Sequence, residues 1–537
     1  MASSQRYDYL VVGAGAAGCA VAARLSEDPT NRVMLIEAGG FDRHILLRIP
    51  SLNIFTTLLP QHQWDFHSEP VPALNDRRLQ FNQGKGLGGS SSVNGMIYMR
   101  GNSREFDRWR DAGCEGWSFA EVLPFYKKSE TNARGEGQWH GGSGPLKVRR
   151  ARPQLGICDA FLAAAAEAGF PVLEDVSASN AVEGFGYFDV NIHRGRRISA
   201  ATAYLKPARK RPNLTVMPNA PALRVVVEKG RATGVEIGRD GSRETISAER
   251  EVVLCSGSYN SPQLLMLSGI GPADHLRAHG IEPIVDAPEV GQNLRNHPVY
   301  SLRYGCSEPI TVYRYLNPVR AIGAWIQFAM TGNGPVGETY NCLGGFFRTA
   351  YSPELADIIV TMAPGLIRRV KRGGKPWDVL PNQHGFQVSA LVARPQSAGE
   401  IRLRSSDPAA SPMIFPNYFA EPQDLRTLVS GVQRLREMMR GRSIAGVLTG
   451  ELEQDANRLD DESLAEDIRD RSRSASHPMG TCRMGSDASS VVDPALRVRG
   501  VDGLRVADAS IVPSALGACT HAPAIMIGEK AADLIRR

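Results

Sequence analysis

Three glycines and one glutamate near the N-terminus have the spacing that binds a dinucleotide. Gly13, Gly15 and Gly18 follow the apolar run 7–12 and precede a helix-like stretch, and Glu37 ends the next apolar run. Such glycines permit a tight turn and let the backbone approach a pyrophosphate at a helix N-terminus. A carboxylate about 20 residues further on can bind the ribose hydroxyls. The sequence therefore predicts a bound adenine dinucleotide, without distinguishing a nicotinamide from a flavin.

Two histidines have the local sequence of acid–base groups. His477 and His521 each lie in a short segment with a proline among small residues, where a side chain can be fixed in a cleft. A neutral imidazole can accept a hydroxyl proton at neutral pH. We predict His477 as the base and His521 as the hydrogen-bond partner of the substrate oxygen, with exchanged or shared roles left open. Two neighbouring imidazoles disfavour double protonation, which predicts coupled titration and lower activity at acid pH.

Other chemistries have weaker support. His275 and His279 are four residues apart on a predicted helix, but no suitable third ligand accompanies them, and no metal site is predicted. The serines 90–92 lack the Gly-x-Ser-x-Gly turn of a nucleophile, so acyl transfer is not predicted. The basic cluster 368–372 is interpreted as a solvated loop. A nucleic-acid partner is not predicted, because these aromatic residues are better explained as core or pocket wall: Trp325, Phe328, Phe346, Phe347 and Trp377.

Bulk properties indicate a large globular enzyme. The 537 residues exceed what one core usually supports, so two interleaved domains are expected. The net charge of +6 comes from scattered basic residues. Eight cysteines without a Cys-x-x-Cys pair predict reduced thiols. No apolar leader or long uncharged apolar stretch is evident, which predicts a cytoplasmic protein and leaves peripheral attachment to the inner membrane open.

A coarse reading of periodicity predicts an α/β protein of mixed α+β character. The loop 84–95 is dense in glycine and serine and is expected to approach a ligand. Ser261 and Pro262 are expected to start a helix, Ser261 as its cap. Strands are predicted at 214–217, 223–228, 232–237, 251–255, 386–393, 400–403 and 504–507, and helices at 424–439 and 523–535.

Four segments resemble those of the glucose-methanol-choline (GMC) oxidoreductases, in the bacterial FAD-dependent alcohol dehydrogenase branch. They are the opening glycine motif, the loop 84–95, the segment 257–271, and the C-terminal set 477–481, 508–510 and 520–523. The resemblance implies FAD as the cofactor. Positions that match FAD contacts of the family are Gly13, Ala14, Gly15, Gly18, Glu37, Gly88, Ser92, Asn94, Val225, Asp508, Ala509 and His521 or Ala522. The histidine that carries covalent flavin in some members is Val93 here, so dissociable FAD is expected.

The resemblance also implies a Rossmann-like FAD-binding domain with an interleaved substrate-binding domain, built on an antiparallel sheet with helices. The expected parts are FAD-binding residues 1–155, a substrate-domain segment 156–194, FAD-binding residues 195–300, the substrate-binding domain 301–465, and a last FAD-binding part 466–537 with the catalytic histidines. His477 matches the family's base and His521 its partner. A helix that starts at Pro523 would stabilise a reduced flavin anion if its N-terminus pointed at the ring.

The expected reaction is oxidation of an alcohol, with hydride transfer to the flavin. Choline is disfavoured because Cys342 stands where choline-oxidising relatives commonly have a glutamate, and Glu338 is offset. A neutral primary alcohol or polyol is expected, in a pocket shaped by Tyr340, Phe346 and Trp377. A quinone or other carrier is the expected electron acceptor. An oxygen-using oxidase and a hydroxynitrile lyase remain alternatives.

Overall fold

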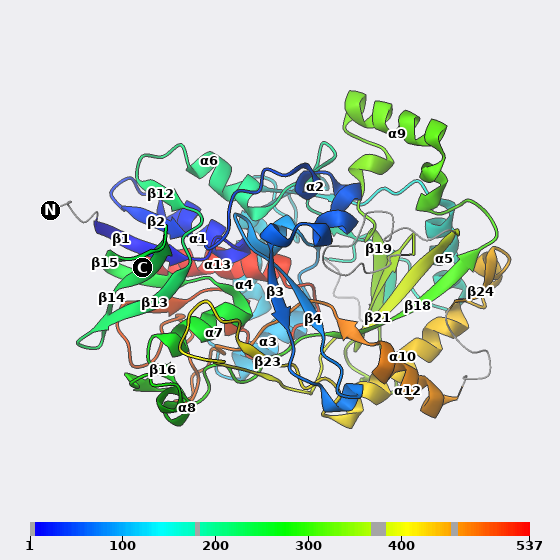
Figure 1. The fold of residues 1–537 in the computed structure, drawn as a ribbon. Helices are drawn as coiled ribbons and strands as arrows, with labels where there is room; N and C mark the ends of the chain where they lie inside the picture. Colours follow the sequence, from blue (N-terminus) through cyan, green and yellow to red (C-terminus); the bar gives the residue numbers. More distant parts are fainter. Residues whose placement is uncertain (1–5, 178–182, 367–382, 453–459) are drawn as a thin grey trace.

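A mixed sheet of seven strands supports the N-terminal part of the molecule (Figure 1). The computed structural model describes residues 6–177, 183–366, 383–452 and 460–537. The strands of this sheet are β1 (Arg6–Val12), β2 (Val33–Ile36), β12 (Leu214–Met217), β13 (Ala222–Glu228), β14 (Arg231–Arg239), β15 (Ser242–Leu254) and β26 (Leu504–Val506). Parallel pairing gives the order β12-β2-β1-β15-β26, while β14 and β13 add antiparallel strands beside the first half of β15. All four residues of β2 are apolar and buried, as expected for a parallel strand covered on both faces.

Helices α1 (Ala16–Leu25) and α13 (His521–Arg536) pack together beside this sheet (Figure 1). An ion pair whose carboxylate is fully buried joins them. Arg24 donates from Nε and Nη2 to the Glu529 carboxylate, with both distances 2.8 Å. The Tyr204 hydroxyl also donates to Glu529, at 2.7 Å. The chain's C-terminal helix is thereby tied to its first helix by a buried charge.

A second sheet of seven strands forms the other part of the molecule. Its strands are β8 (Gly184–Tyr187), β18 (Pro298–Cys306), β19 (Leu343–Phe347), β20 (Ile358–Ala363), β21 (Gly385–Val392), β24 (Leu448–Glu451) and β25 (Arg473–Ser474), and every pairing is antiparallel. One face is apolar, with buried Tyr300, Leu302, Phe386 and Val388, and α10 (Pro422–Met438) covers it. The opposite face carries polar side chains. The predicted α/β fold with an antiparallel second sheet is confirmed.

Shorter elements connect and cover the two sheets. The further helices are α2 (Ile45–Arg48), α3 (Ser103–Asp111), α4 (Phe119–Ser129), α5 (Gly156–Glu167), α6 (Lys206–Ala208), α7 (Gly257–Leu267), α8 (Ala273–Ala278), α9 (Pro318–Thr331), α11 (Arg442–Ala445) and α12 (Asp461–Arg471). The 3₁₀ segments are η1 (Pro50–Leu58), η2 (Pro60–His62), η3 (Pro72–Leu74), η4 (Gly89–Ser92), η6 (Val312–Leu316), η7 (Pro335–Gly337) and η9 (Ala509–Ile511), and η5 (Ala201–Leu205) is a short π-helix. Small sheets contain β3 (Gln63–His67), β4 (Gln80–Gly84), β5 (Ile97–Tyr98), β6 (Glu130–Asn132), β7 (Leu146–Arg150), β9 (Asp189–Val190), β10 (Ile192–His193), β11 (Arg196–Arg197), β16 (Ile270–Gly271), β17 (Val285–Asp286), β22 (Glu400–Arg402) and β23 (Met413–Phe415). Among the described residues, no helix combines the length and apolarity needed to cross a bilayer.

The expected start of α7 is wrong, and the reason lies in the backbone. The helix begins at Gly257, which places Pro262 in its interior and makes Ser256 the cap residue. Proline has no N–H, so it leaves the carbonyl of Ser258 without its helical donor. The Thr481 hydroxyl supplies that donor at 2.6 Å. A tertiary contact from the C-terminal part therefore permits the helix to start earlier than the local sequence indicates.

Two other boundaries differ from the prediction. β12 has its predicted bounds and pairs parallel to β2, whereas β15 starts at Ser242, well before the predicted strand at 251–255. The early half of β15 is polar on its exposed side, so its apolar pattern was too weak to read. α13 starts two residues before the predicted Pro523, which makes His521 its first residue.

We expect the Glu529 carboxylate to contribute measurably to the stability of the folded chain. We expect Glu529→Ala to lower the free energy of unfolding by about 1–3 kcal/mol, because it removes the buried acceptor of Arg24 and Tyr204, while Glu27 still pairs with Arg24. Urea unfolding followed by circular dichroism measures the change. The matched control is Glu249→Ala, which removes an exposed pair with Arg6 and should cost under about 1 kcal/mol. Equal effects of the two substitutions would contradict the assignment.

Candidate active site

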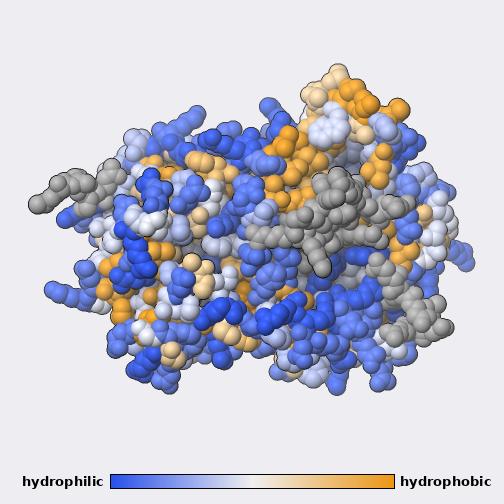
Figure 2. Space-filling view, viewed as in Figure 1, coloured by the Kyte–Doolittle hydropathy of each residue, from blue (hydrophilic) through white to orange (hydrophobic). Residues whose placement is uncertain are grey.

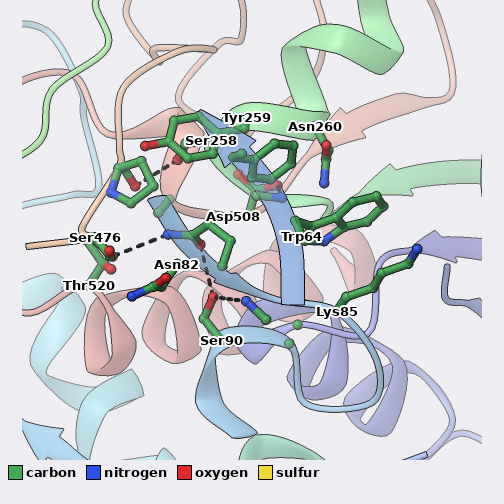
Figure 3. A pocket seen from close by; sticks show the side chains of 18 of the residues that line it. Trp64, Asn82, Lys85, Ser90, Ser258, Tyr259, Asn260, Ser476, Asp508 and Thr520 are labelled. Atoms are coloured by element: carbon green, nitrogen blue, oxygen red, sulfur yellow. Dashed lines mark hydrogen bonds between the residues drawn. The ribbon is translucent and has the colours of Figure 1, made fainter. Parts of the chain in front are cut away.

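A cavity of about 710 Å³ lies between segments that flank the first sheet and one face of the second sheet. Its wall combines the turn before α1, the strands β3 and β4, the loop 84–95 and the start of α7. The polar face of the second sheet and the C-terminal segments that contain His477 and His521 complete it. Figure 3 shows Trp64 and Lys85 on one side, Tyr259 and Asn260 from α7, and Thr520 from the C-terminal part. Residues far apart in the sequence therefore meet in one cavity.

The glycine turn has the shape that the spacing predicts. Gly13 has a φ of +101°, and a Cβ there would lie 2.5 Å from the carbonyl oxygen of Cys255. A Cβ on Gly18 would lie 1.9 Å from the Gly13 carbonyl oxygen. Gly15 differs, because its Cβ would meet nothing closer than 3.8 Å and the residue lines the cavity. Gly13 and Gly18 are needed for packing, whereas Gly15 keeps space open for a ligand.

Glu37 lines the cavity and also organises its wall. Its Oε1 accepts from the backbone N–H groups of Gly39 (2.8 Å) and Gly86 (3.0 Å), and its Oε2 accepts from Ala14 N–H (2.7 Å). Burial raises the pKa of Glu37, while these donors and Lys85 oppose the rise. One acceptor position on Oε2 stays available for a ribose hydroxyl. Ala14 itself is fully buried and does not line the cavity.

Two of the predicted FAD contacts in the loop 84–95, Gly88 and Ser92, shape its backbone and do not line the cavity. Gly88 has a φ of +90°, and the Ser92 hydroxyl donates to the carbonyl of Leu87 at 2.9 Å. Val93 and Asn94 do line it. Asn94 is held by Arg197, whose Nη1 donates to Oδ1 at 2.7 Å.

Asp508 fixes the opposite part of the wall. Its Oδ2 accepts from Gly257 N–H (2.9 Å) and the Ser261 hydroxyl (2.6 Å), and its Oδ1 accepts from Ser510 N–H (2.8 Å). The carboxylate therefore caps η9 and anchors the start of α7. Asp508 and Ala509 both line the cavity.

Val225 and Ala522, two residues predicted to contact FAD, lie behind the cavity wall. The Val225 N–H donates to the Ser268 hydroxyl at 2.8 Å, and Val225 is 2% exposed. Ala522 is buried in the first turn of α13. Neither lines the cavity.

His477 has a partner that sequence analysis missed. Its Nδ1 lies 3.0 Å from Nδ1 of His297, and Nε2 of His297 lies 3.0 Å from the carbonyl oxygen of Leu516. A carbonyl only accepts, so Nε2 of His297 carries the hydrogen and its Nδ1 accepts. His477 must then donate from Nδ1, which leaves a lone pair on Nε2. No described residue forms a hydrogen bond to that atom, and His477 lines the cavity.

The imidazoles of this site are neutral at pH 7. Burial lowers the pKa of His477 to about 3, and His297 adds to the effect. Burial likewise lowers the pKa of His297 to about 4. His521 also has a pKa lowered to about 4, by burial and by the charge of Arg197. Each ring is therefore available as a proton acceptor or a neutral hydrogen-bond donor.

His521 is a buried polar group in need of a ligand. It begins α13 and is 7% exposed, and neither ring nitrogen has a hydrogen-bond partner among the described residues. Buried polar atoms are nearly always paired, so the orphaned nitrogens of a cavity-lining residue indicate a missing ligand. His297 could have been found by the criterion that identified His477, since it also directly precedes a proline.

Two of the three residues expected to shape the substrate pocket are not part of the cavity wall. Tyr340 and Phe346 do not line the cavity, whereas Trp377 lies outside the described residues, as does the basic cluster 368–372. Glu338 also stays outside the cavity wall, where its carboxylate accepts from Arg149 at 2.6 Å. The cavity is lined instead by residues of the second sheet and its flanks: Val299, Asn341, Thr361, Gln387, Ser389, Leu391 and Arg473.

A further buried cluster surrounds His140, away from the cavity wall. His140 Nδ1 lies 3.1 Å from Glu130 Oε1 and Nε2 lies 2.6 Å from Asp175 Oδ2. Burial lowers its pKa, but the two carboxylates outweigh burial and raise it to about 9. Arg100 and Arg134 contact the same acidic groups, so protein cations already balance them. His275 accepts from Leu403 N–H, and its ring packs edge-on against His279.

Comparisons with known proteins agree with this geometry. Residues 7–299 and 395–528 match models of the GMC oxidoreductase family. Proteins named oxygen-dependent choline dehydrogenase from Sinorhizobium fredii (strain NBRC 101917 / NGR234) and Rhizobium meliloti (strain 1021) are each 42% identical over 98% of this chain and 95% of theirs.

Solved structures give the same result. A formate oxidase from Aspergillus oryzae RIB40, studied for FAD modification, is 26% identical with a TM-score of 0.92, covering 100% of this chain and 99% of its own. Pyridoxine 4-oxidase from Mesorbium loti is 29% identical with a TM-score of 0.87, covering 98% of each chain. The protein is therefore an FAD enzyme that acts on CH–OH groups, and it belongs to the GMC oxidoreductase family.

Proposed function

We propose that the chain oxidises a neutral primary alcohol or polyol, with FAD held without a covalent bond and His477 as the base. The observation that carries this proposal is the hydrogen-bond relay from Leu516 through His297 to His477. It supports a single tautomer of His477, with the Nε2 lone pair unbonded in a residue that lines the cavity. Val93 replaces a histidine at the position of covalent attachment and lines the cavity, which supports a dissociable cofactor.

The part of the cavity wall expected to hold FAD, here called the cradle, fits the cofactor because Gly15 leaves ligand space and Glu37 keeps an acceptor position for a ribose hydroxyl. The proposed contacts are the predicted residues that line the cavity: Gly13, Gly15, Glu37, Asn94, Asp508 and Ala509. Ala14, Gly18, Gly88, Ser92, Val225 and Ala522 are proposed to support these contacts from behind the wall. When bound, FAD supplies the hydride acceptor.

The proposed proton step uses groups that are already positioned. Nε2 of His477 takes the hydroxyl proton, and the imidazolium that forms keeps donating from Nδ1 to His297. The His297 Nε2–H stays bonded to the Leu516 carbonyl, so the relay does not need to rearrange. His521 would donate to the substrate oxygen, which gives its orphaned ring a partner.

The polar face of the second sheet supports the proposed substrate class. Ser389 lies opposite Ser301 on β18 and Thr361 on β20, so these hydroxyls share one face. The Gln387 amide donates to the Ser389 hydroxyl at 3.1 Å, while its buried Oε1 has no partner among the described residues. An unpaired buried acceptor favours a substrate with a further hydroxyl donor.

Choline is the second candidate, because the curated relatives at 42% identity are named choline dehydrogenases. A quaternary ammonium group is bound by carboxylates or open aromatic faces. Glu37 and Asp508, the carboxylates that line the cavity, each already accept three hydrogen bonds. Lys85 lies over the Trp64 ring at 4.7 Å, and Arg473 adds a second cation to the wall. These charges favour a neutral alcohol over choline.

A quinone or other carrier is the proposed electron acceptor. The relatives' name includes oxygen dependence, which keeps an oxygen-using oxidase as the alternative. A hydroxynitrile lyase that uses similar histidines is the non-redox alternative, and a flavin spectrum distinguishes it.

We also propose the predicted domain division, with 1–155, 195–300 and 466–537 binding FAD and 156–194 and 301–465 binding substrate. The strands of the first sheet all fall in the FAD-binding parts. The second sheet draws on both sets, because β25 lies at residues 473–474 and β18 begins at Pro298. The boundary between the parts therefore crosses the active site.

His477→Ala tests the proposed base. We expect the variant to retain the yellow flavin and to lose alcohol turnover by about 10²–10⁴-fold, the usual contribution of a general base. The visible spectrum is recorded without oxygen before and after addition of a panel of neutral alcohols and choline. Wild type should bleach with neutral alcohols. His279→Ala, outside the cavity, is the control and should bleach like wild type. Near-normal bleaching by His477→Ala would remove His477 from the mechanism.

Gly15→Val tests the proposed cofactor cradle. The new side chain meets no protein atom at its Cβ closer than 3.8 Å, so the fold should persist while the side chain occupies ligand space. We expect normal circular dichroism and loss of flavin absorbance from the purified protein. Gly446→Ala is the control, because a Cβ there would meet nothing within 4 Å at an ordinary helical φ of −65°; it lies outside the cavity wall and should keep its flavin. Flavin retention by Gly15→Val would contradict the cradle.

Gln387→Leu tests the proposed substrate class. Loss of one neutral hydrogen bond is worth about 0.5–1.5 kcal/mol, so kcat/KM for a polyol should fall by about 3–10-fold. The value for a simple alkanol should change less, because it lacks the second hydroxyl. Gln396→Leu, an exposed position, is the matched control. A uniform loss for polyol and alkanol would argue against Gln387 as a specificity residue.

A further inference from the structure

Helix α9 presents a large apolar stripe to solvent. Val319, Ile322, Ile326 and Met330 are 78%, 61%, 55% and 80% exposed and recur on successive turns, so they share one side of the helix. Trp325 is 43% exposed beside them, which corrects its interpretation as core or pocket wall. Figure 2 shows this apolar cap at the top of the molecule, over α9 of Figure 1.

The inner side of α9 is apolar as well. Ala324 and Phe328 are buried against Ile49 and Val336. The helix is thus apolar on two sides and carries only one charged residue, Arg320. A helix that is apolar on most of its circumference is expected inside a core or a membrane, not on a water-exposed surface.

The surroundings of the stripe are rich in positive charge. Three described segments adjoin one another here: 43–58, 192–197 and 312–337. They contain seven arginines, while the carboxylates that flank them in the sequence are Asp42 and Glu338, the second already paired with Arg149 at 2.6 Å. Gly195 shows how closely they meet, since a Cβ there would lie 2.1 Å from the Gly332 carbonyl oxygen at the end of α9. The exposed arginines around the stripe are Arg43, Arg48, Arg194, Arg196 and Arg320.

We propose that the α9 stripe and its arginine rim dock the enzyme on an anionic lipid bilayer. An apolar stripe with a tryptophan and a basic rim is the composition of helices that lie in the plane of a membrane surface. At 1.5 Å per residue, the 14 residues of α9 span about 21 Å, too short to cross a hydrocarbon core of about 30 Å. The helix therefore lies in the interface, and the arginines face the lipid phosphates.

Charge distinguishes the bilayer from a second copy of the chain. A symmetric dimer built on this stripe would bring the two arginine rims together, because a two-fold interface pairs a surface with itself. Like charges would oppose that contact. Anionic headgroups supply the missing opposite charge.

The docking surface is linked to the cavity by a short stretch of chain. After α9 the chain passes through η7 to Thr339, whose hydroxyl donates to the Gly95 carbonyl at 3.0 Å. Asn341 follows and lines the cavity beside Gly95. Docking through α9 would hold this wall near the bilayer. A membrane-soluble quinone as electron acceptor would suit that position, and this clause alone rests on the proposed function.

Vesicle cosedimentation of the holoenzyme tests the proposal without an activity assay. We expect binding to vesicles of equal parts phosphatidylglycerol and phosphatidylcholine, weakened by salt, and little binding to phosphatidylcholine alone. Met330→Glu places a carboxylate on the stripe and should weaken binding by about tenfold or more. Ile284→Glu, an equally apolar position that is 49% exposed elsewhere, should bind like wild type. Both variants should keep wild-type turnover with a water-soluble acceptor.

Three results would overturn the proposal. They are absence of binding to the anionic vesicles, equal binding by Met330→Glu and wild type, and wild-type dimerisation in sedimentation velocity that Met330→Glu abolishes. The last result would assign the stripe to a second copy of the chain. Failure of turnover with every alcohol, by contrast, would affect the proposed function and leave the vesicle result intact.

Discussion

The buried Glu37 carboxylate holds together the part of the molecule on which the cavity depends. Its three backbone donors come from three separate segments, at Ala14, Gly39 and Gly86. A buried charge that lost these donors would cost several kcal/mol, so the three segments are held in one arrangement. Asp508 does the same for the start of α7 and the C-terminal segment. The cradle is thereby formed before a ligand arrives, which reduces the ordering cost of binding.

Side chains alternate between the two faces of the second sheet, so that one face packs under α10 and the other lines the cavity. On β18, Tyr300 and Leu302 face the apolar side under α10, while Val299 and Ser301 face the other side. His297 directly precedes this strand and His477 follows β25, its partner strand. The hydrogen bond from Ala475 N–H to the His297 carbonyl extends that pairing. The relay between the two imidazoles is therefore positioned by the register of a sheet and not by a flexible loop.

The sequence predicted those features that short-range patterns encode. The glycine turn, the apolar strands β1, β2 and β12 and the helix α10 follow from local spacing and periodicity. The family resemblance added FAD as the cofactor and supported the prediction of His477 as the base. Features set by distant contacts were missed. His297 becomes a relay group only because β18 pairs with β25, and the start of α7 depends on the Thr481 hydroxyl. The exposed stripe of α9 was missed because its apolar pattern fits a core helix equally well.

The cavity wall is assembled from chain segments that are far apart in order of synthesis. Gly15 and Glu37 emerge early from the ribosome, Gln387 much later, and His521 among the last residues. A nascent chain thus cannot complete the cavity until nearly all of it has been translated. Contacts of such high sequence separation form slowly, and the early apolar surface of α1 must wait for α13. Because the proposed FAD contacts include both Gly15 and Asp508, a complete FAD site forms only late, and a ligand that binds only the folded chain stabilises it by mass action.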